Sequence, residues 1–147
     1  AAGALSFEAA LALVGPRGKL MQAAGVARPG AMGAVIGIGD DAQITTLCEQ
    51  AADVGVVVAA NFNAPGQVVV SGEQAAVARL GELALGAGAK RLIELAVSGA
   101  FHSPLMQPAT EQMEALLQVA PIVAPRVPVL TNVSAAPVVD PEELARI

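Results

Sequence analysis

The alternation of hydrophobic and polar positions changes its period several times along the middle of the chain. Short runs rich in valine, isoleucine and alanine predict β-strands, since apolar residues of this kind pack well on a buried or half-buried sheet. Two segments between these runs place apolar residues three and four positions apart, which is typical of amphipathic helices. The predicted strands are residues 31–38, 54–62, 67–71 and 90–97. One predicted helix follows Asp40, and the other covers residues 73–87.

The resulting order of elements, βαββαβ, is that of the ferredoxin-like split unit. Such a unit has four antiparallel strands with two helices on one face, so the middle of the chain is predicted to be an α/β subdomain. Asp40 is expected to cap the first helix, whose apolar side carries Leu47 and Cys48. Pro65 and Gly66 stand in the order of a type II turn between the second and third strands.

A further helix is predicted to begin at Ser6, because apolar residues keep a helical spacing from Phe7 to Met21. Gly15-Pro16 is expected to interrupt this helix, since proline has no backbone N–H to donate. Residues 25–30 contain two glycines and one proline and are therefore predicted to form a linker.

The C-terminal part predicts a helix over residues 103–119, with Ser103 as its N-cap and Pro104 in the first helical position. This helix and the N-terminal one have no partner inside the ferredoxin-like unit. They are expected to belong to a second, larger subdomain, of which the chain holds only parts, and we expect the chain to be a piece of a longer protein. The predicted segments are residues 1–29 and 98–147 for the partial large subdomain and 30–97 for the small one.

The composition excludes several classes of partner. Aromatic residues make up 2% of the 147 residues, and the formal net charge is −5. A base-stacking surface and a basic phosphate-binding face are therefore not expected, which argues against nucleic-acid binding. No apolar run reaches the roughly 18 residues of a membrane helix, and no basic segment precedes an N-terminal apolar run. We expect a cytoplasmic protein without a membrane partner.

Metal, disulfide and dinucleotide chemistry also lack support in the sequence. Cys48 is the single cysteine, so no internal disulfide forms, and its place on an apolar helix face predicts a buried, unreactive thiol. No cluster of His, Asp and Glu suggests a metal site. The sequence contains neither a G-x-G-x-x-G fingerprint nor a G-x-S-x-G nucleophile elbow.

The single histidine, His102, lies between a strand-like run that ends at Val97 and the helix start at Ser103. A histidine at such a junction is a candidate general base. The alternative is a loop histidine that only satisfies its own hydrogen bonds. Arg17 follows the expected helix break, and its planar guanidinium could bind a carboxylate through two parallel hydrogen bonds. The alternative for Arg17 is a stem that packs while its head reaches water.

Three segments of the chain together resemble one family. They are Arg17-Gly-Lys-Leu-Met-Gln, Asn61-Phe-Asn-Ala-Pro-Gly-Gln-Val-Val-Val-Ser-Gly and Phe101-His-Ser-Pro-Leu-Met, in this order and spacing. They resemble the malonyl-CoA:acyl-carrier-protein transacylases, the acyltransferases of fatty-acid synthesis. The resemblance covers nearly the whole chain and implies a ferredoxin-like subdomain inserted in an α/β-hydrolase-like large subdomain, which is incomplete here.

The resemblance also implies roles for four residues. His102 matches the histidine that takes a proton from a nucleophilic serine, and Arg17 matches the arginine that pairs with the free malonyl carboxylate. Phe101 matches the position that crowds the α-carbon of the acyl group, and Met21 is expected to line the same pocket. The implied substrates are malonyl-CoA and a phosphopantetheinylated acyl carrier protein, and no cofactor is implied.

The serine of the family lies in a Gly-His-Ser-Leu-Gly-Glu type of elbow, which would precede residue 1, so the chain alone is expected to be inactive. Two alternatives stay open at this point. The first is a polyketide-type acyltransferase that uses another acyl-CoA. The second is a non-catalytic ferredoxin-like binding module in which His102 is only structural.

Overall fold

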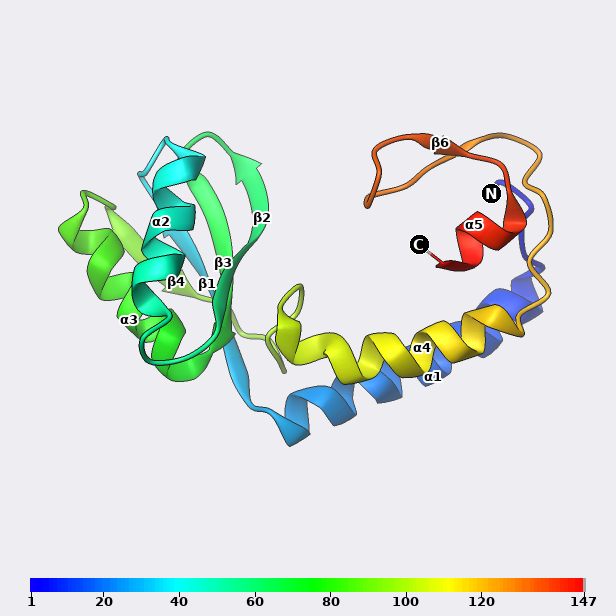
Figure 1. Ribbon diagram of the computed structural model, residues 1–147, viewed down its shortest axis with the longest axis horizontal. Coiled ribbons are helices and arrows are strands. Elements are labelled where there is room, and N and C mark those ends of the chain that lie inside the picture. Colours follow the sequence, from blue (N-terminus) through cyan, green and yellow to red (C-terminus); the bar gives the residue numbers. More distant parts are fainter. Residues whose placement is uncertain (147) are drawn as a thin grey trace. The chain divides into compact units, whose positions relative to one another are not determined.

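The computed structural model describes residues 1–146, which form two compact units. One unit is Met21–Pro108, and the other combines Ala1–Leu20 with the residues from Ala109 onward. The first unit contains a four-stranded sheet and the helices that pack on it (Figure 1). The division into segments 1–29, 30–97 and 98–147 stays a prediction, because it concerns how these parts belong to subdomains of a longer chain.

The elements of the sheet unit follow the predicted βαββαβ order. They are β1 (Gly30–Ile36), α2 (Asp41–Ala51), β2 (Val57–Ala64), β3 (Gln67–Glu73), α3 (Gln74–Gly86) and β4 (Arg91–Glu94). The strands lie in the order β2-β3-β1-β4, and all three neighbouring pairs are antiparallel. The mixed α/β class and the ferredoxin-like order of elements are therefore confirmed.

The core of this unit lies between the sheet and the helices α2 and α3, which cover the same face of the sheet (Figure 1). Its fully buried members include Val35 and Val70 from the sheet and Ile44 and Leu80 from the helices. The helix α2 begins where the sequence predicted, because the side chain of Asp40 accepts a hydrogen bond of 3.0 Å from the backbone N–H of Ala42.

The opposite face of the sheet carries a second, smaller apolar cluster. Met32, Ala34 and Val69 are its buried members, and Phe101 packs against them from the loop that follows β4. Successive side chains of a strand point to opposite faces, so Val69 belongs to this cluster while its neighbour Val70 belongs to the helix-covered core. The loop that contains His102 is thus attached to the face that the helices leave open.

Two glycines are required by the backbone of the sheet unit. Gly66, with φ of +77°, completes the predicted two-residue connection between β2 and β3, where Ala64 pairs with Gln67. At Gly72 in β3, an added Cβ would meet the carbonyl oxygen of Val56 and lie 2.6 Å from the Cα of Val57. Only a glycine permits this close approach of the two strands.

Two predictions for the N-terminal helix are wrong. The helix α1 runs without a break over Phe7–Ala27 and contains Pro16, because a proline removes one backbone donor while the hydrogen bonds on either side continue the helix. Residues 25–30 are not a linker, since α1 ends at Ala27 and β1 begins at Gly30. Gly25 is buried, and a Cβ there would lie 2.7 Å from the carbonyl oxygen of Ser98. This glycine serves close packing and not chain flexibility.

The predicted C-terminal helix begins as a short 3-10 helix, η1 (Pro104–Met106), and continues as α4 (Gln107–Gln118). It is followed by a small antiparallel pair of strands, β5 (Val129–Leu130) and β6 (Pro137–Val138), and by α5 (Pro141–Arg146). None of the helices in residues 1–146 combines the length and the apolar character that a membrane crossing requires.

Candidate active site

The loop that carries His102 is fixed to the sheet by its neighbours in sequence. Ala100 and Leu105 are both completely buried. They pack against the start of β1, where a Cβ added to Gly30 would lie 2.6 Å from the Cβ of Ala100 and 3.1 Å from Cδ2 of Leu105. Because Gly30 has no side chain, Ala100 and Leu105 can pack directly against the backbone of β1. The loop therefore cannot move without disturbing this packing.

Ser103 holds this loop together by two hydrogen bonds. As the sequence predicted, Ser103 is the N-cap of the following helix, and its Oγ accepts a bond of 3.3 Å from the N–H of Leu105. The same hydroxyl donates a bond of 2.6 Å to the carbonyl oxygen of Ala100. The second bond was not foreseen, because it depends on the backbone conformation of Phe101 and His102 and not on the residue types alone.

His102 is exposed and has an unusual backbone conformation. Its φ is +60°, and Ala135 is the other non-glycine residue with a positive φ in residues 1–146. A left-handed conformation costs an L-residue about 1–2 kcal/mol. The ring of His102 makes no hydrogen bond with the described part of the chain, and both the general base and the surface or loop histidine stay predictions. A strained backbone beside an exposed imidazole that makes no hydrogen bond with the described residues is typical of functional sites.

Phe101 and Met21 belong to the same compact unit as His102. Phe101 is half-buried against the open-face cluster of the sheet, and Met21 is half-buried on α1. The helix and the loop meet at two glycines, because a Cβ on Gly99 would lie 3.4 Å from the Cα of Gly25 and 3.7 Å from Cε1 of Phe101. The structure therefore brings α1 against the loop that holds two of the predicted site residues.

Arg17 lies on α1, four residues before Met21 and thus on the same side of the helix. It is assigned to the other compact unit, and its side chain is exposed. Arg28 forms an ion pair with Glu73, and Arg79 forms one with Glu82. The guanidinium of Arg17 takes part in neither pair, and it therefore stays available for an anion.

Cys48 does not compete with His102 as a reactive group. Burial raises the pKa of the Cys48 thiol to about 11, so the thiol stays protonated near neutral pH. The predicted buried, unreactive thiol is thereby supported. In the part of the chain that the structure describes, no group of three His, Cys, Asp or Glu side chains is arranged to hold a metal ion.

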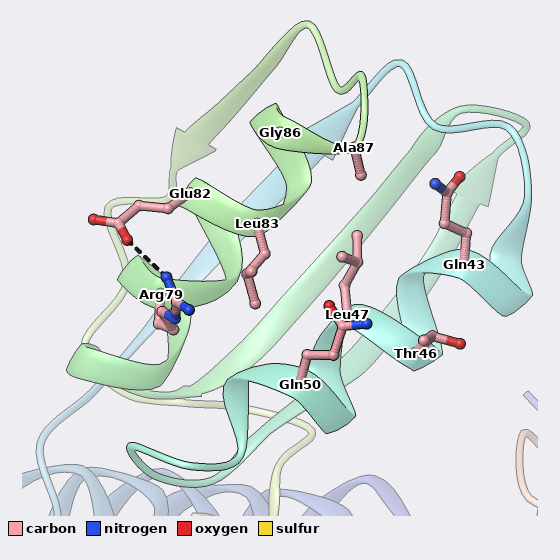
Figure 2. Close-up of a pocket in the computed structure, with 9 residues that line it drawn as sticks. All are labelled: Gln43, Thr46, Leu47, Gln50, Arg79, Glu82, Leu83, Gly86 and Ala87. Atoms are coloured by element: carbon pink, nitrogen blue, oxygen red, sulfur yellow. Dashed lines mark hydrogen bonds and ion pairs between the residues drawn. The ribbon is translucent and has the colours of Figure 1, made fainter.

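A groove of about 490 Å³ lies between α2 and α3, on the side of these helices away from the sheet (Figure 2). Its charged side chains are Arg79 and Glu82, which form an ion pair of 3.3 Å with each other. The other lining residues are amides, a threonine and small or apolar residues: Gln43, Thr46, Leu47, Gln50, Leu83, Gly86 and Ala87. None of the four predicted site residues lines the groove.

Comparison with known proteins identifies the family of the chain. The acyl transferase domain family matches residues 1–147. The malonyl CoA-acyl carrier protein transacylase of Haemophilus influenzae is 49% identical over 132 residues, which cover 90% of this chain and 42% of that protein. The acyl-carrier-protein S-malonyltransferase of Burkholderia pseudomallei 1710b matches with a TM-score of 0.90 at 40% identity, over 99% of this chain and 47% of that one.

A third relative is a malonyl-transacylase whose structure was solved in complex with a type II PKS acyl-carrier protein. It matches with a TM-score of 0.90 at 40% identity, over 98% of this chain and 46% of that chain. The chain thus spans somewhat less than half the length of these relatives. The resemblance that the three sequence segments indicated is confirmed. Because the family model covers all 147 residues, the chain belongs to the acyl transferase domain family.

Proposed function

We propose that the whole protein that carries this chain transfers a malonyl group from malonyl-CoA to the phosphopantetheine thiol of an acyl carrier protein. The observation that carries this proposal is His102. It is an exposed and hydrogen-bond-free histidine, held in a strained conformation, inside a segment that matches malonyl transacylases. The proposal includes a cytoplasmic location, where malonyl-CoA and the carrier protein would meet the enzyme.

In the proposed mechanism, His102 acts as the general base for a serine outside the 147 residues. The ring takes the proton of the serine hydroxyl while the serine oxygen attacks the thioester carbonyl of malonyl-CoA. The C–S bond then breaks, the CoA sulfur takes the proton back from the imidazolium, and a malonyl-serine ester remains. In the second half-reaction the thiol of the carrier protein gives its proton to His102 and attacks this ester. The bond to the serine oxygen breaks, the imidazolium returns the proton to that oxygen, and malonyl-acyl carrier protein leaves as the thioester product.

Three further residues would select the acyl group. Arg17 would pair with the free carboxylate of malonate, which is supported by its exposed guanidinium and its absence from the ion pairs of the described chain. Phe101 would limit the space beside the α-carbon, and Met21 would line the same pocket. Acetyl-CoA would then be a poor substrate, because it lacks the carboxylate that Arg17 binds.

The base role of His102 is tested with His102→Asn in the whole protein. Asparagine tolerates a left-handed backbone but cannot act as a base, so the variant removes the chemistry and keeps the conformation. We expect the rate of malonyl transfer from radiolabelled malonyl-CoA to holo-acyl carrier protein to fall by roughly 10³-fold or more. Turnover within tenfold of the parent would refute the base role and would mean that His102 is only structural.

The role of Arg17 is tested with Arg17→Ala, and Lys19→Ala is the matched control, because it removes a cation from an exposed position on the same helix. Arg17→Ala should lower the preference for malonyl-CoA over acetyl-CoA by about 100-fold, while Lys19→Ala should leave it unchanged. An equal effect of both substitutions would mean that only the general charge of α1 matters. Efficient turnover of methylmalonyl-CoA by the parent protein would favour the polyketide-type alternative.

The chain by itself is expected to be inactive, since the proposed serine nucleophile is not among its residues. A mixture of residues 1–147 with radiolabelled malonyl-CoA should therefore give no covalent malonyl label on the polypeptide. Label that survives denaturation would show that a residue of this chain acts as the nucleophile. That result would overturn the division of roles described above.

A further inference from the structure

The conformation of His102 is imposed by its neighbours. The residue has a φ of +60°, and its ring makes no hydrogen bond with the described residues that would hold this left-handed backbone. An exposed histidine on a free loop would relax to a conformation with a negative φ. The cause of the strain must therefore lie in the residues directly before and after it.

Ser103 supplies the hydrogen bonds that close the backbone around His102. Its hydroxyl reaches back to the carbonyl oxygen of Ala100 at 2.6 Å and accepts the N–H of Leu105 at 3.3 Å. The first bond encloses Phe101 and His102 in a tight turn, and the second ties this turn to the start of the helix. Because the Ser103 side chain is buried, water cannot easily replace either bond.

The ends of the turn are fixed to the sheet. Ala100 and Leu105 are completely buried and pack on Gly30, so the two backbone groups that bond to Ser103 cannot shift toward a relaxed geometry. Both ends of the turn are fixed, and Ser103 bridges them. The backbone angles of Phe101 and His102 are therefore restricted to a narrow range. This arrangement directs the His102 side chain outward, to the exposed side of the loop.

We propose that Ser103 is a positioning residue for His102, and that its hydroxyl holds the imidazole in the orientation that proton transfer requires. This inference rests on the proposed function, because it assigns Ser103 a part in the malonyl-transfer reaction. Ser103 does not touch the reacting atoms. Its removal should lower the rate of the chemical step and leave the binding of malonyl-CoA nearly unchanged.

The test compares Ser103→Ala with Ser103→Thr and Ser6→Ala in the whole protein. Ser6 accepts a hydrogen bond of 3.1 Å from the N–H of Ala9 at the start of α1, so Ser6→Ala removes a similar helix cap away from the turn. Ser103→Ala should lower kcat by about 10- to 100-fold, because a small displacement of a catalytic group costs rates of this order. The KM for malonyl-CoA should change less than twofold, Ser103→Thr should restore most of kcat, and Ser6→Ala should have no effect.

The ring of His102 gives a readout that does not depend on turnover. Its NMR signal can be assigned by its loss in His102→Asn, and we expect it to shift or broaden in Ser103→Ala and to return in Ser103→Thr. An unchanged ring signal in Ser103→Ala, or a kcat within twofold of the parent, would overturn the positioning role. If the whole protein transfers no malonyl group, the proposed function fails, while the ring signals still decide whether Ser103 orders His102.

Discussion

The left-handed backbone at His102 predicts that stability and activity respond to one substitution in opposite directions. His102→Gly removes the imidazole and, at the same time, the Cβ that makes a positive φ unfavourable. The folded state loses little, since the ring is exposed and makes no hydrogen bond with the described residues. We therefore expect a variant that is inactive in malonyl transfer and at least as stable as the parent.

The size of the effect follows from two opposing contributions. Relief of the left-handed strain contributes about 1–2 kcal/mol in favour of the glycine variant. The larger conformational freedom of glycine in the unfolded chain opposes folding by about 0.5–1 kcal/mol. Histidine adopts this conformation more readily than most residues, which places the strain near its lower limit. The free energy of unfolding should therefore rise by about 0 to 1 kcal/mol.

The measurement is urea-induced unfolding of the whole protein, monitored by circular dichroism, for the parent and two glycine variants. Ala78→Gly is the matched control, because Ala78 is an exposed residue in the middle of α3 and belongs to the same compact unit. Glycine in a helix interior should lower the free energy of unfolding by about 1 kcal/mol. The two substitutions are thus expected to differ in sign, although both introduce a glycine at an exposed position.

A loss of more than about 1 kcal/mol in His102→Gly, equal to that in Ala78→Gly, would refute this reasoning. It would mean that the histidine side chain stabilises its own turn, and the strain could then no longer be read as a sign of function. A stable variant that also keeps full activity would leave the strain argument intact and contradict the base role of His102.

Other predictions concern packing, thiol reactivity and pH. Gly72→Ala should lower the free energy of unfolding by about 2 kcal/mol or more, because the new Cβ meets backbone atoms of Val56 and Val57. Gly39→Ala, with no heavy atom within 4 Å of the new Cβ, should change it by less than about 0.5 kcal/mol in the same urea titration. Cys48, whose pKa is raised to about 11 by burial, should react with a thiol reagent at pH 8 only after denaturation. The pKa of Glu73 is lowered mainly by a hydrogen bond from the Val56 N–H and, to a smaller extent, by one from the Arg28 guanidinium. The stability that Glu73 contributes is therefore present above the ordinary glutamate pKa of 4.5 and is lost as the pH falls through the lowered pKa. The acid side of the stability profile should therefore flatten in Glu73→Gln.

The sequence by itself determined the order of elements and the inward faces of the sheet unit. Leu47 and Cys48 lie in the core, as the helical spacing predicted, and Asp40 caps α2. Ser103 caps the next helix, and Pro65 and Gly66 connect β2 with β3 as predicted. These features depend on residues that are neighbours along the chain, so the preferences of single side chains were sufficient to find them.

The motif segments also pointed to His102, Phe101, Met21 and Arg17 without any coordinates. Their roles stay predictions, and the structure adds the state of each side chain. His102 is exposed, and its ring makes no hydrogen bond with the described residues. Arg17 is exposed and takes part in neither of the ion pairs described above, while Phe101 and Met21 are half-buried. Sequence resemblance transfers an identity at a position, whereas the exposure that a base or an anion clamp requires can be read only from the folded chain.

Tertiary structure alone decided two features that matter for the site. The helix α1 continues through Pro16, and Gly25 serves contact with Ser98 instead of chain flexibility. The left-handed backbone of His102 arises because Ala100 is fixed on Gly30 and bonded to Ser103. Such contacts join residues that are far apart in the chain or depend on an unusual backbone angle. Local patterns of hydrophobicity carry no information about either, and so the sequence located the histidine while the fold determined how it is held.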